Sequence, residues 1–149
     1  EQMVGLFINT LPVGVTIPGD QPLLPWLHAL QQTQATAQEH GYLSLVDIQR
    51  WSGIARGTPL FESVLVFENY PLNSTQDADV NVIQAIESHE QTSYPLTIYA
   101  FPGTEFTFDF NYDTRRFDAA TIERMVGHFQ TLLANMVAKP SQRMERDTE

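Results

Sequence analysis

The sequence has no cysteine and little positive charge. The absence of cysteine from 149 residues excludes disulfides, thiolate metal ligands and thiol nucleophiles together. Eight lysines and arginines stand against 18 aspartates and glutamates, which gives a formal net charge of −10. A surface of this sign repels phosphate backbones, so we expect no nucleic-acid partner.

Long apolar runs are also missing. No run approaches the roughly 18 apolar residues that a membrane-spanning helix needs, so no membrane association is expected. The apolar stretch Val4–Ile8 lies almost at the start, without a basic leader or a small-residue cleavage site. We therefore expect a cytoplasmic protein without a secretory signal, and both ends resemble cuts through a longer polypeptide.

The sequence does contain enough apolar residues for one folded domain. Hydrophobic residues make up 42% of the chain, and a domain of this length buries roughly 70% of its unfolded surface. A helical pattern ends near residue 138, and the residues after it are polar and aperiodic. This predicts a domain over residues 1–139 and a polar tail or linker over residues 140–149.

The spacing of apolar residues predicts strands interspersed with helices. Alternating or continuous apolar runs predict strands at 13–17, 64–67, 80–90, 96–101 and 106–112. Helical spacing predicts helices at 23–41, 44–52 and 118–136, with Asp20 and Asp118 as capping residues. The turn Pro102-Gly103 joins two strands as a hairpin, so the sheet is mixed. We interpret the aromatic row Phe106, Phe108 and Phe110 as core, with a cofactor slot as the alternative. The predicted fold class is α/β, a mixed β-sheet flanked by helices.

The residues form no complete active site by themselves. No two histidines have the i, i+4 spacing that places both imidazoles on one helical face, so no metal site is predicted. No Gly-x-Ser-x-Gly elbow and no glycine-rich phosphate loop occurs either. We interpret Arg115 and Arg116 as a solvated turn, with contact to an anion as the alternative. The histidines, interpreted as surface or satisfied core residues, are His28, His40, His89 and His128.

The most informative polar residues follow the apolar run 64–67. That run predicts a strand buried on both faces and therefore central in the sheet. Asn69 and Tyr70 come directly after it, at the carboxyl end of the strand, where ligands commonly bind in α/β sheets. The alternative is that both residues begin the turn before Pro71, and composition does not separate the two.

Several ordered segments carry a family resemblance. They are Met3–Val13, Leu45–Ser52, Thr58–Pro71, Tyr94–Thr97 and Tyr112-Asp113. In order and spacing, over residues 3–138, they resemble the carboxy-terminal lobe of condensation domains from nonribosomal peptide synthetases. The resemblance implies a chloramphenicol-acetyltransferase-like lobe.

The resemblance implies that this lobe forms one wall of a tunnel between two lobes. A phosphopantetheine-borne acyl or peptidyl donor enters from one side and an aminoacyl acceptor from the other, and the acceptor amine attacks the donor thioester to form an amide. The implied partners are the amino-terminal lobe, peptidyl carrier domains and an adjacent adenylation domain, and the chain binds no cofactor directly. The family's His-His-x-x-x-Asp-Gly motif belongs to the other lobe and does not occur here. We therefore expect no catalytic residue in this chain, and no activity from the chain alone.

The resemblance also assigns substrate-tunnel residues. Asn9 and Thr10 match an element beside the tunnel floor. Asn69, followed by Tyr70, matches a position near the tunnel centre that can hydrogen-bond the substrate or the intermediate. Residues 72–94 resemble the element that latches the lobes. Residues 66–71 favour a member that joins an L-configured donor to an L-acceptor, with terminal, heterocyclising and epimerising relatives as the open alternatives.

Two other functions stay open. One is a noncatalytic module that binds carrier proteins or acts as a scaffold, having kept the lobe and lost its chemistry. The other is a stand-alone acetyltransferase-like oligomer with sites between protomers. A lobe that normally packs on a partner exposes an apolar face when isolated, so we also expect the isolated chain to pair as a homodimer.

Overall fold

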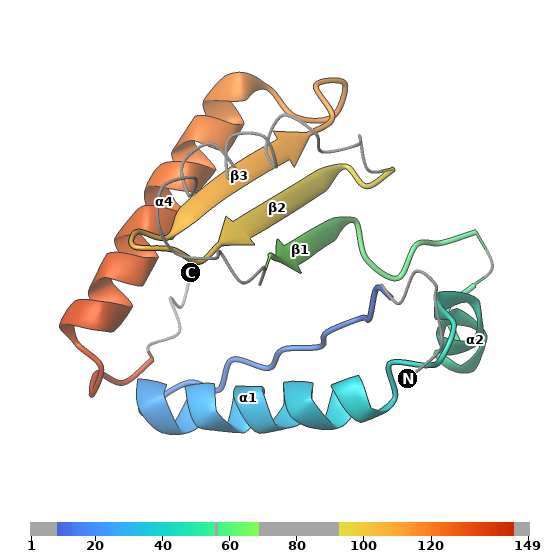
Figure 1. Cartoon of the computed structure of the whole chain (residues 1–149), viewed down its shortest axis with the longest axis horizontal. Coiled ribbons are helices and arrows are strands. Elements are labelled where there is room, and N and C mark those ends of the chain that lie inside the picture. The colour runs from blue at the N-terminus through green and yellow to red at the C-terminus, as the bar shows by residue number, and fades with distance from the viewer. Residues whose placement is uncertain (1–8, 56, 69–92, 145–149) are drawn as a thin grey trace. The chain divides into compact units, whose positions relative to one another are not determined.

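The computed structural model describes residues 9–55, 57–68 and 93–144 (Figure 1). The chain divides into two compact units, Glu1–Leu60 with His128–Glu149, and Phe61–Gly127. The strand expected at 80–90 and nearly all of the expected latch at 72–94 lie outside the described residues.

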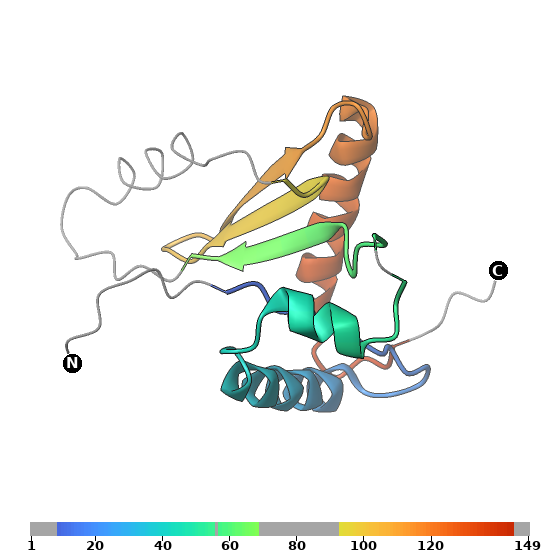
Figure 2. The same ribbon diagram turned by 90° about the vertical axis from the view of Figure 1, so that its right-hand side faces the viewer.

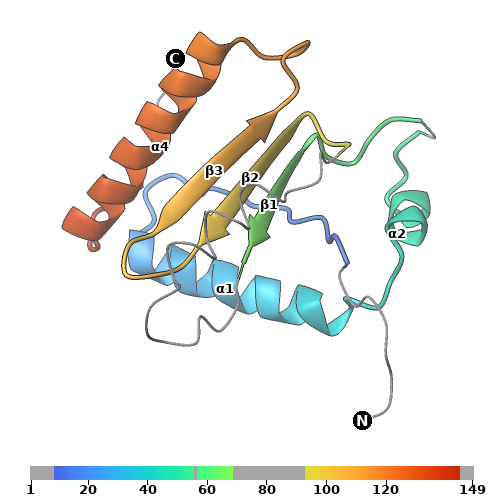
Figure 3. The ribbon, with the colours of Figure 1, turned by 45° about the horizontal axis from the view of Figure 1, so that its top comes forward.

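The second unit contains a three-stranded sheet. Its strands are β1 (Ser63–Phe67), β2 (Leu96–Phe101) and β3 (Thr107–Tyr112), in the order β1-β2-β3. β1 pairs with β2 in parallel and β2 pairs with β3 antiparallel. The strands lie side by side as one layer, which both Figure 2 and Figure 3 show. The sheet is therefore mixed and the chain also contains helices, which confirms the predicted fold class.

The register places the aromatic residues of β3 on one face. Phe110 lies opposite Ile98, which lies opposite Leu65, so these three side chains form a row across the sheet. Phe108 and Ala100 belong to the next row of the same face. Because side chains alternate along a strand, the predicted alternation of residues 106–112 is realised within β3.

The opposite face of β2 supplies the core of this unit. The side chains of β2 that point to that face are Thr97, Tyr99 and Phe101, and all three are buried. Burial raises the pKa of the Tyr99 hydroxyl, and the carboxylates of Glu68 and Asp109 raise it further. The Tyr99 hydroxyl therefore stays neutral at physiological pH.

The position of β1 differs from the prediction. The apolar run predicts a central strand buried on both faces, but among the described residues β1 is at the edge of the sheet. The side chains of Leu65 and Phe67 are 67% and 56% exposed. A continuous apolar run shows that both faces can be covered, but it does not reveal which segment covers them.

The first unit contains α1 (Leu23–Glu39) and α2 (Leu45–Trp51). The longest helix, α4 (Ala119–Ala138), begins in the second unit and continues into the first. Ser44 caps α2, because its hydroxyl accepts a hydrogen bond from the backbone N–H of Asp47 at 3.1 Å. Asp118 caps α4 as predicted, accepting from the backbone N–H of Thr121 at 2.7 Å.

The start of α1 differs from the prediction. The residue at the N-cap is Pro22 rather than Asp20, and no side chain caps the helix. Asp20 has a φ of 64°. Its carboxylate instead accepts a hydrogen bond from Nη1 of Arg143 at 2.7 Å.

The C-terminal segment provides hydrogen-bond partners for the start of α1, where no side chain caps the helix. The backbone N–H of Leu23 donates to the carbonyl oxygen of Gln142 at 2.9 Å, and Met144 donates to Gln21 at 2.9 Å. Nη1 of Arg143 also donates to the backbone carbonyl of Asp20 at 2.6 Å. The first N–H groups of a helix have no partner within it, so this segment acts as a cap from a distant part of the sequence. The domain boundary at residue 139 stays a prediction, and residues 142–144 are hydrogen-bonded to residues 20–23 of the same unit.

The segment 13–17, predicted as a strand, pairs with no described strand. It runs alongside α1 (Figure 1), where the indole N–H of Trp26 donates to the carbonyl of Thr16 at 2.9 Å. The apolar side chains of Val13, Val15 and Ile17 are exposed. Alternation predicts an extended segment with one apolar face, and pairing depends on a partner that the local sequence does not specify.

Candidate functional site

Asn9 and Thr10 are the first described residues, and Asn9 is hydrogen-bonded to the turn that follows α1. Its side-chain nitrogen Nδ2 donates to the carbonyl oxygens of Gly41 at 2.7 Å and Leu43 at 2.8 Å. Because both partners are acceptors, only the nitrogen of the amide can face them. Both N–H groups of Asn9 are therefore used, and its Oδ1 is left as an acceptor.

The residues that Asn9 contacts form a tight turn after α1. Within it, His40, Gly41 and Leu43 each donate a backbone hydrogen bond to a residue three positions earlier, at 2.9–3.1 Å. A Cβ atom on Gly41 would lie 3.0 Å from the carbonyl oxygen of Gln38 and 3.8 Å from Cδ1 of Leu11. The turn therefore has little space for a side chain at residue 41, and Leu11, two residues after Asn9, lies near it.

The carboxyl end of β1 carries the second group of predicted tunnel residues. The backbone N–H of Glu68 donates to the carbonyl of Ala100 at 2.9 Å, which continues the pairing with β2 by one residue. Asn69 and Tyr70 lie outside the described residues. The place of all four residues in a tunnel stays a prediction.

Exposed apolar side chains gather at β1. We call Leu65, Phe67 and Phe106 the β1 apolar patch; they are 67%, 56% and 59% exposed. The ring centroids of Phe67 and Phe106 are 6.2 Å apart, and those of Phe106 and Phe108 are 5.9 Å apart. The sequence interpretation assigned Phe106 to the core, which is wrong among the described residues. Phe106 lies just before β3, where the alternation of that strand does not determine its burial.

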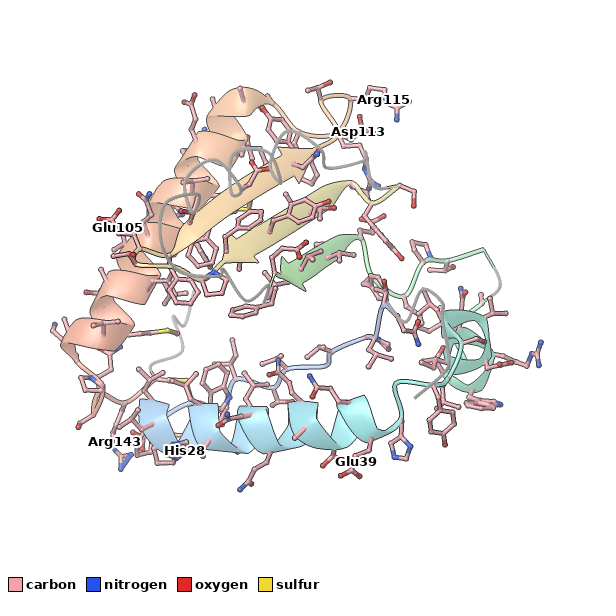
Figure 4. All side chains as sticks on the ribbon, viewed as in Figure 1. His28, Glu39, Glu105, Asp113, Arg115 and Arg143 are labelled. Atoms are coloured by element: carbon pink, nitrogen blue, oxygen red, sulfur yellow. The ribbon has the colours of Figure 1, made fainter. Side chains whose placement is uncertain are left out.

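Asp113 and the arginines after it form a charged turn between β3 and α4. Figure 4 shows Asp113 and Arg115 beside each other on this turn. Nε and Nη2 of Arg115 donate to the two carboxylate oxygens of Asp113 at 2.9 and 2.8 Å. Hydrogen bonds from the side chain and backbone of Arg115 lower the pKa of Asp113 from 3.8 to about 2.

The second arginine of this turn also has a partner. Nη2 of Arg116 donates to both carboxylate oxygens of Glu62 at 3.1 Å, which links the turn to the residue before β1. Both guanidinium groups therefore have carboxylate partners within the unit. This supports the interpretation of a structural turn over that of an anion site.

The described residues offer no metal centre and no membrane span. Within 9–55, 57–68 and 93–144, no three histidine, cysteine, aspartate or glutamate side chains gather as metal ligands would. In the same ranges, no helix combines the length and the apolar content that crossing a bilayer requires. The prediction that the chain itself binds no cofactor stays a prediction.

The chain belongs to the family described as the condensation domain, which it matches over residues 1–148. It is 45% identical over 144 residues to one of the proteins that make up linear gramicidin synthase in Brevibacillus parabrevis, and these residues are 95% of this chain and 2% of that protein. It is 44% identical over 155 residues to another protein of the same synthase, which covers 97% of this chain and 3% of that protein. Chondramide synthase of Chondromyces crocatus is 41% identical over 145 residues, which are 97% of this chain and 4% of that protein. The family resemblance predicted from the sequence is confirmed, and the chain spans only a few per cent of the length of these relatives.

Proposed function

We propose that the chain is the carboxy-terminal lobe of a condensation domain that forms amide bonds in a nonribosomal peptide synthetase. The observation that carries the proposal is the family match over residues 1–148. Relatives that are peptide synthases by name, at 41–45% identity over 95% or more of the chain, support it. The mixed sheet with helices is consistent with such a lobe.

The proposed reaction is the aminolysis of a thioester. The nitrogen of the acceptor amine attacks the carbonyl carbon of the donor, a C–N bond forms, and the C–S bond to the donor's phosphopantetheine arm breaks. The amine loses a proton and the departing sulfur gains one, so a free thiol remains on the donor carrier domain. Such a reaction depends largely on holding two arms in place and on stabilising the oxyanion that develops.

The chain contributes a wall to this reaction, and the amino-terminal lobe contributes the proton-handling histidine. No His-His-x-x-x-Asp-Gly sequence occurs in the chain, so we assign no catalytic residue to it. Asn9 and Thr10 stand beside the tunnel floor, and Asn69 and Tyr70 stand near its centre. The β1 apolar patch supports a role as an inner surface, because exposed apolar groups beside a strand end suit contact with another lobe or with a substrate.

The partners follow from the same proposal. The amino-terminal lobe completes the domain, peptidyl carrier domains deliver the donor and acceptor on phosphopantetheine arms, and an adenylation domain lies beside it in the synthetase. The protein then works in the cytoplasm. Residues 66–71 favour an L-configured donor and an L-acceptor.

Reconstitution tests the catalytic proposal. The chain is mixed with the amino-terminal lobe of its parent, loaded carrier domains are added, and amide formation is measured by mass spectrometry. We expect product only when both lobes are present. The proposal is wrong if the two lobes bind each other but make no product under conditions in which the intact parent domain forms the amide.

A second candidate function is a noncatalytic module that binds carrier domains or acts as a scaffold. The absence of the histidine motif from this chain is compatible with both functions, because the motif belongs to the other lobe. It predicts that carrier domains bind the full parent domain without turnover. The parent sequence discriminates the two functions, because an intact His-His-x-x-x-Asp-Gly motif supports the enzyme and a disrupted one supports the scaffold.

A further inference from the structure

We propose that Asn9 is a positioning residue, which ties the segment 9–11 to the turn 40–43 and donates no hydrogen bond to a substrate. This rests on the proposed function, because it specifies how one wall of the tunnel is held. Thr10, next to Asn9, is then oriented by the turn after α1.

The first argument is the number of hydrogen-bond donors. A primary amide has two N–H groups, and Asn9 directs its nitrogen to the carbonyl oxygens of Gly41 and Leu43 at 2.7 and 2.8 Å. Both distances are short for N–H···O hydrogen bonds. To donate to a substrate, Asn9 would have to release one of these carbonyls.

The second argument is that Leu11 also lies near this turn. A Cβ atom on Gly41 would meet Gln38 O at 3.0 Å and Cδ1 of Leu11 at 3.8 Å. The side chain of Leu11 therefore lies beside Gly41, so the segment that begins at Asn9 stays near the turn beyond its two hydrogen bonds.

The third argument concerns α1, the helix that precedes the turn 40–43, because its first residues are hydrogen-bonded as well. The start of α1 is hydrogen-bonded to the C-terminal segment through Leu23 with Gln142 and through Asp20 with Arg143. α1 is thus held at both ends within the first unit, and Asn9 contacts the turn that follows its last residue. Because Asn9 binds the turn attached to this helix, it can set the position of the neighbouring residue Thr10.

The proposal limits what Asn9 can do chemically. Its Oδ1 can accept a hydrogen bond from a substrate amide or ammonium group, but stabilising an oxyanion requires donors. Asn9 therefore does not contribute to an oxyanion site. Its loss therefore acts on the stabilisation of an oxyanion only through the turn.

The test uses the intact parent condensation domain with Asn9→Ala and Asn9→Asp. Asn9→Asp keeps the shape but directs a carboxylate at two carbonyl oxygens, so it is the more damaging change. Hydrogen exchange of the peptide that covers residues 40–45 and the rate of amide formation are both measured. We expect exchange to rise roughly threefold to tenfold and product formation to fall in parallel, while KM for each carrier-bound substrate stays within about twofold.

A matched control makes the same chemical change elsewhere. Gln34→Glu converts an exposed amide on α1 to a carboxylate, and it should leave both the exchange and the rate unchanged. Loss of product with normal exchange of residues 40–45 in both Asn9 variants would show that Asn9 contacts the substrate, and it would overturn the proposal.

A double-mutant cycle tests a second time whether Asn9 acts through the turn. It is informative even if Asn9→Asp does not fold. Gly41→Ala crowds Gln38 O and so disturbs the same turn. If Asn9 acts through the turn, Asn9→Ala combined with Gly41→Ala is little worse than the more damaging single variant. Losses that multiply would contradict the proposal. If the unmodified parent forms no amide at all, the proposed function fails, while the exchange of residues 40–45 still decides the role of Asn9.

Discussion

At the scale of single residues, Asp118 and Asp20 both accept hydrogen bonds near the start of a helix, from donors at very different distances along the chain. Asp118 was predicted as a cap, and its partner Thr121 lies three residues away. Asp20 has the same side chain, but its partner Arg143 lies 123 residues away, so the prediction of a cap was wrong. Asn9 was predicted beside a tunnel from its motif, but nothing in the neighbouring sequence indicated its hydrogen bonds with residues 41 and 43.

Asp113 provides a prediction about pH. Its pKa in the folded protein is about 2, below its ordinary value of 3.8, because Arg115 donates hydrogen bonds to the carboxylate. A lowered pKa in the folded state stabilises the protein above the unfolded pKa, and this contribution is lost as the pH falls from about 4 to about 2. We expect Asp113→Asn to lower the urea midpoint at neutral pH and to flatten its fall over this range.

The measurement is urea unfolding of the chain at several pH values. Arg115→Gln removes the other half of the contact and should flatten the same part of the profile. The double variant should lose no more than the more damaging single one, because both remove one interaction. A full acid-dependent fall in Asp113→Asn would show that other carboxylates control this part of the profile.

At the scale of elements, the helices were predicted better than the strands. Helical spacing and end residues lie within the helix itself, so α1, α2 and α4 were found close to their observed bounds. The register of β2 and β3 followed from alternation and a short connection. The segment 13–17 and the position of β1 in the sheet were not predicted correctly, because pairing depends on residues far away in the sequence.

The N-cap of α2 gives a prediction at this scale. The hydroxyl of Ser44 accepts from Asp47 N at 3.1 Å and donates to Asp47 Oδ2 at 2.7 Å. Ser44→Ala should therefore lower the free energy of unfolding by about 1 kcal/mol, measured by urea denaturation. Thr33→Ala is the contrasting variant, because Thr33 is inside α1 and its hydroxyl bonds only to the carbonyl of Ala29. It should leave stability unchanged or raise it slightly.

The cap that the C-terminal segment provides for α1 gives a second prediction. Arg143→Gln removes the charged hydrogen bonds to the carbonyl and carboxylate oxygens of Asp20. We expect the amide of Leu23 to exchange faster and the free energy of unfolding to fall by about 0.5–1 kcal/mol, since the pair is exposed. Arg50→Gln is the matched control, because Arg50 forms an exposed ion pair with Asp47 at 3.4 Å within one helix. It should have a smaller effect and leave Leu23 unchanged.

At the scale of the whole molecule, the chain carries apolar surface that suits a partner. The side chains of the β1 apolar patch are more than half exposed, and the family relatives are many times longer than this chain. The sequence predicted an apolar face but assigned Phe106 to the core. The burial of such a side chain depends on the segment that packs on it, which the local sequence does not specify.

The expected homodimer of the isolated chain is testable through this patch. If the β1 apolar patch drives self-association, Phe106→Ser should shift the association midpoint, measured by light scattering over a concentration series, to higher concentration. Phe67→Ser should have the same effect. Tyr42→Ser is the control, because Tyr42 is a strongly exposed aromatic in the other compact unit. A chain that stays strictly monomeric at high concentration would contradict the prediction.

The hydrogen bonds between residues 142–144 and the start of α1 have a practical consequence for recombining synthetase modules. A fusion junction placed directly after α4 ends at Ala138 and would discard the acceptor that Gln142 provides for Leu23. A junction placed after Met144 keeps the α1 terminus satisfied whatever sequence is joined next. Chimeras cut at these two places should therefore differ in solubility and yield, although the added stretch is short and carries no predicted substrate residue.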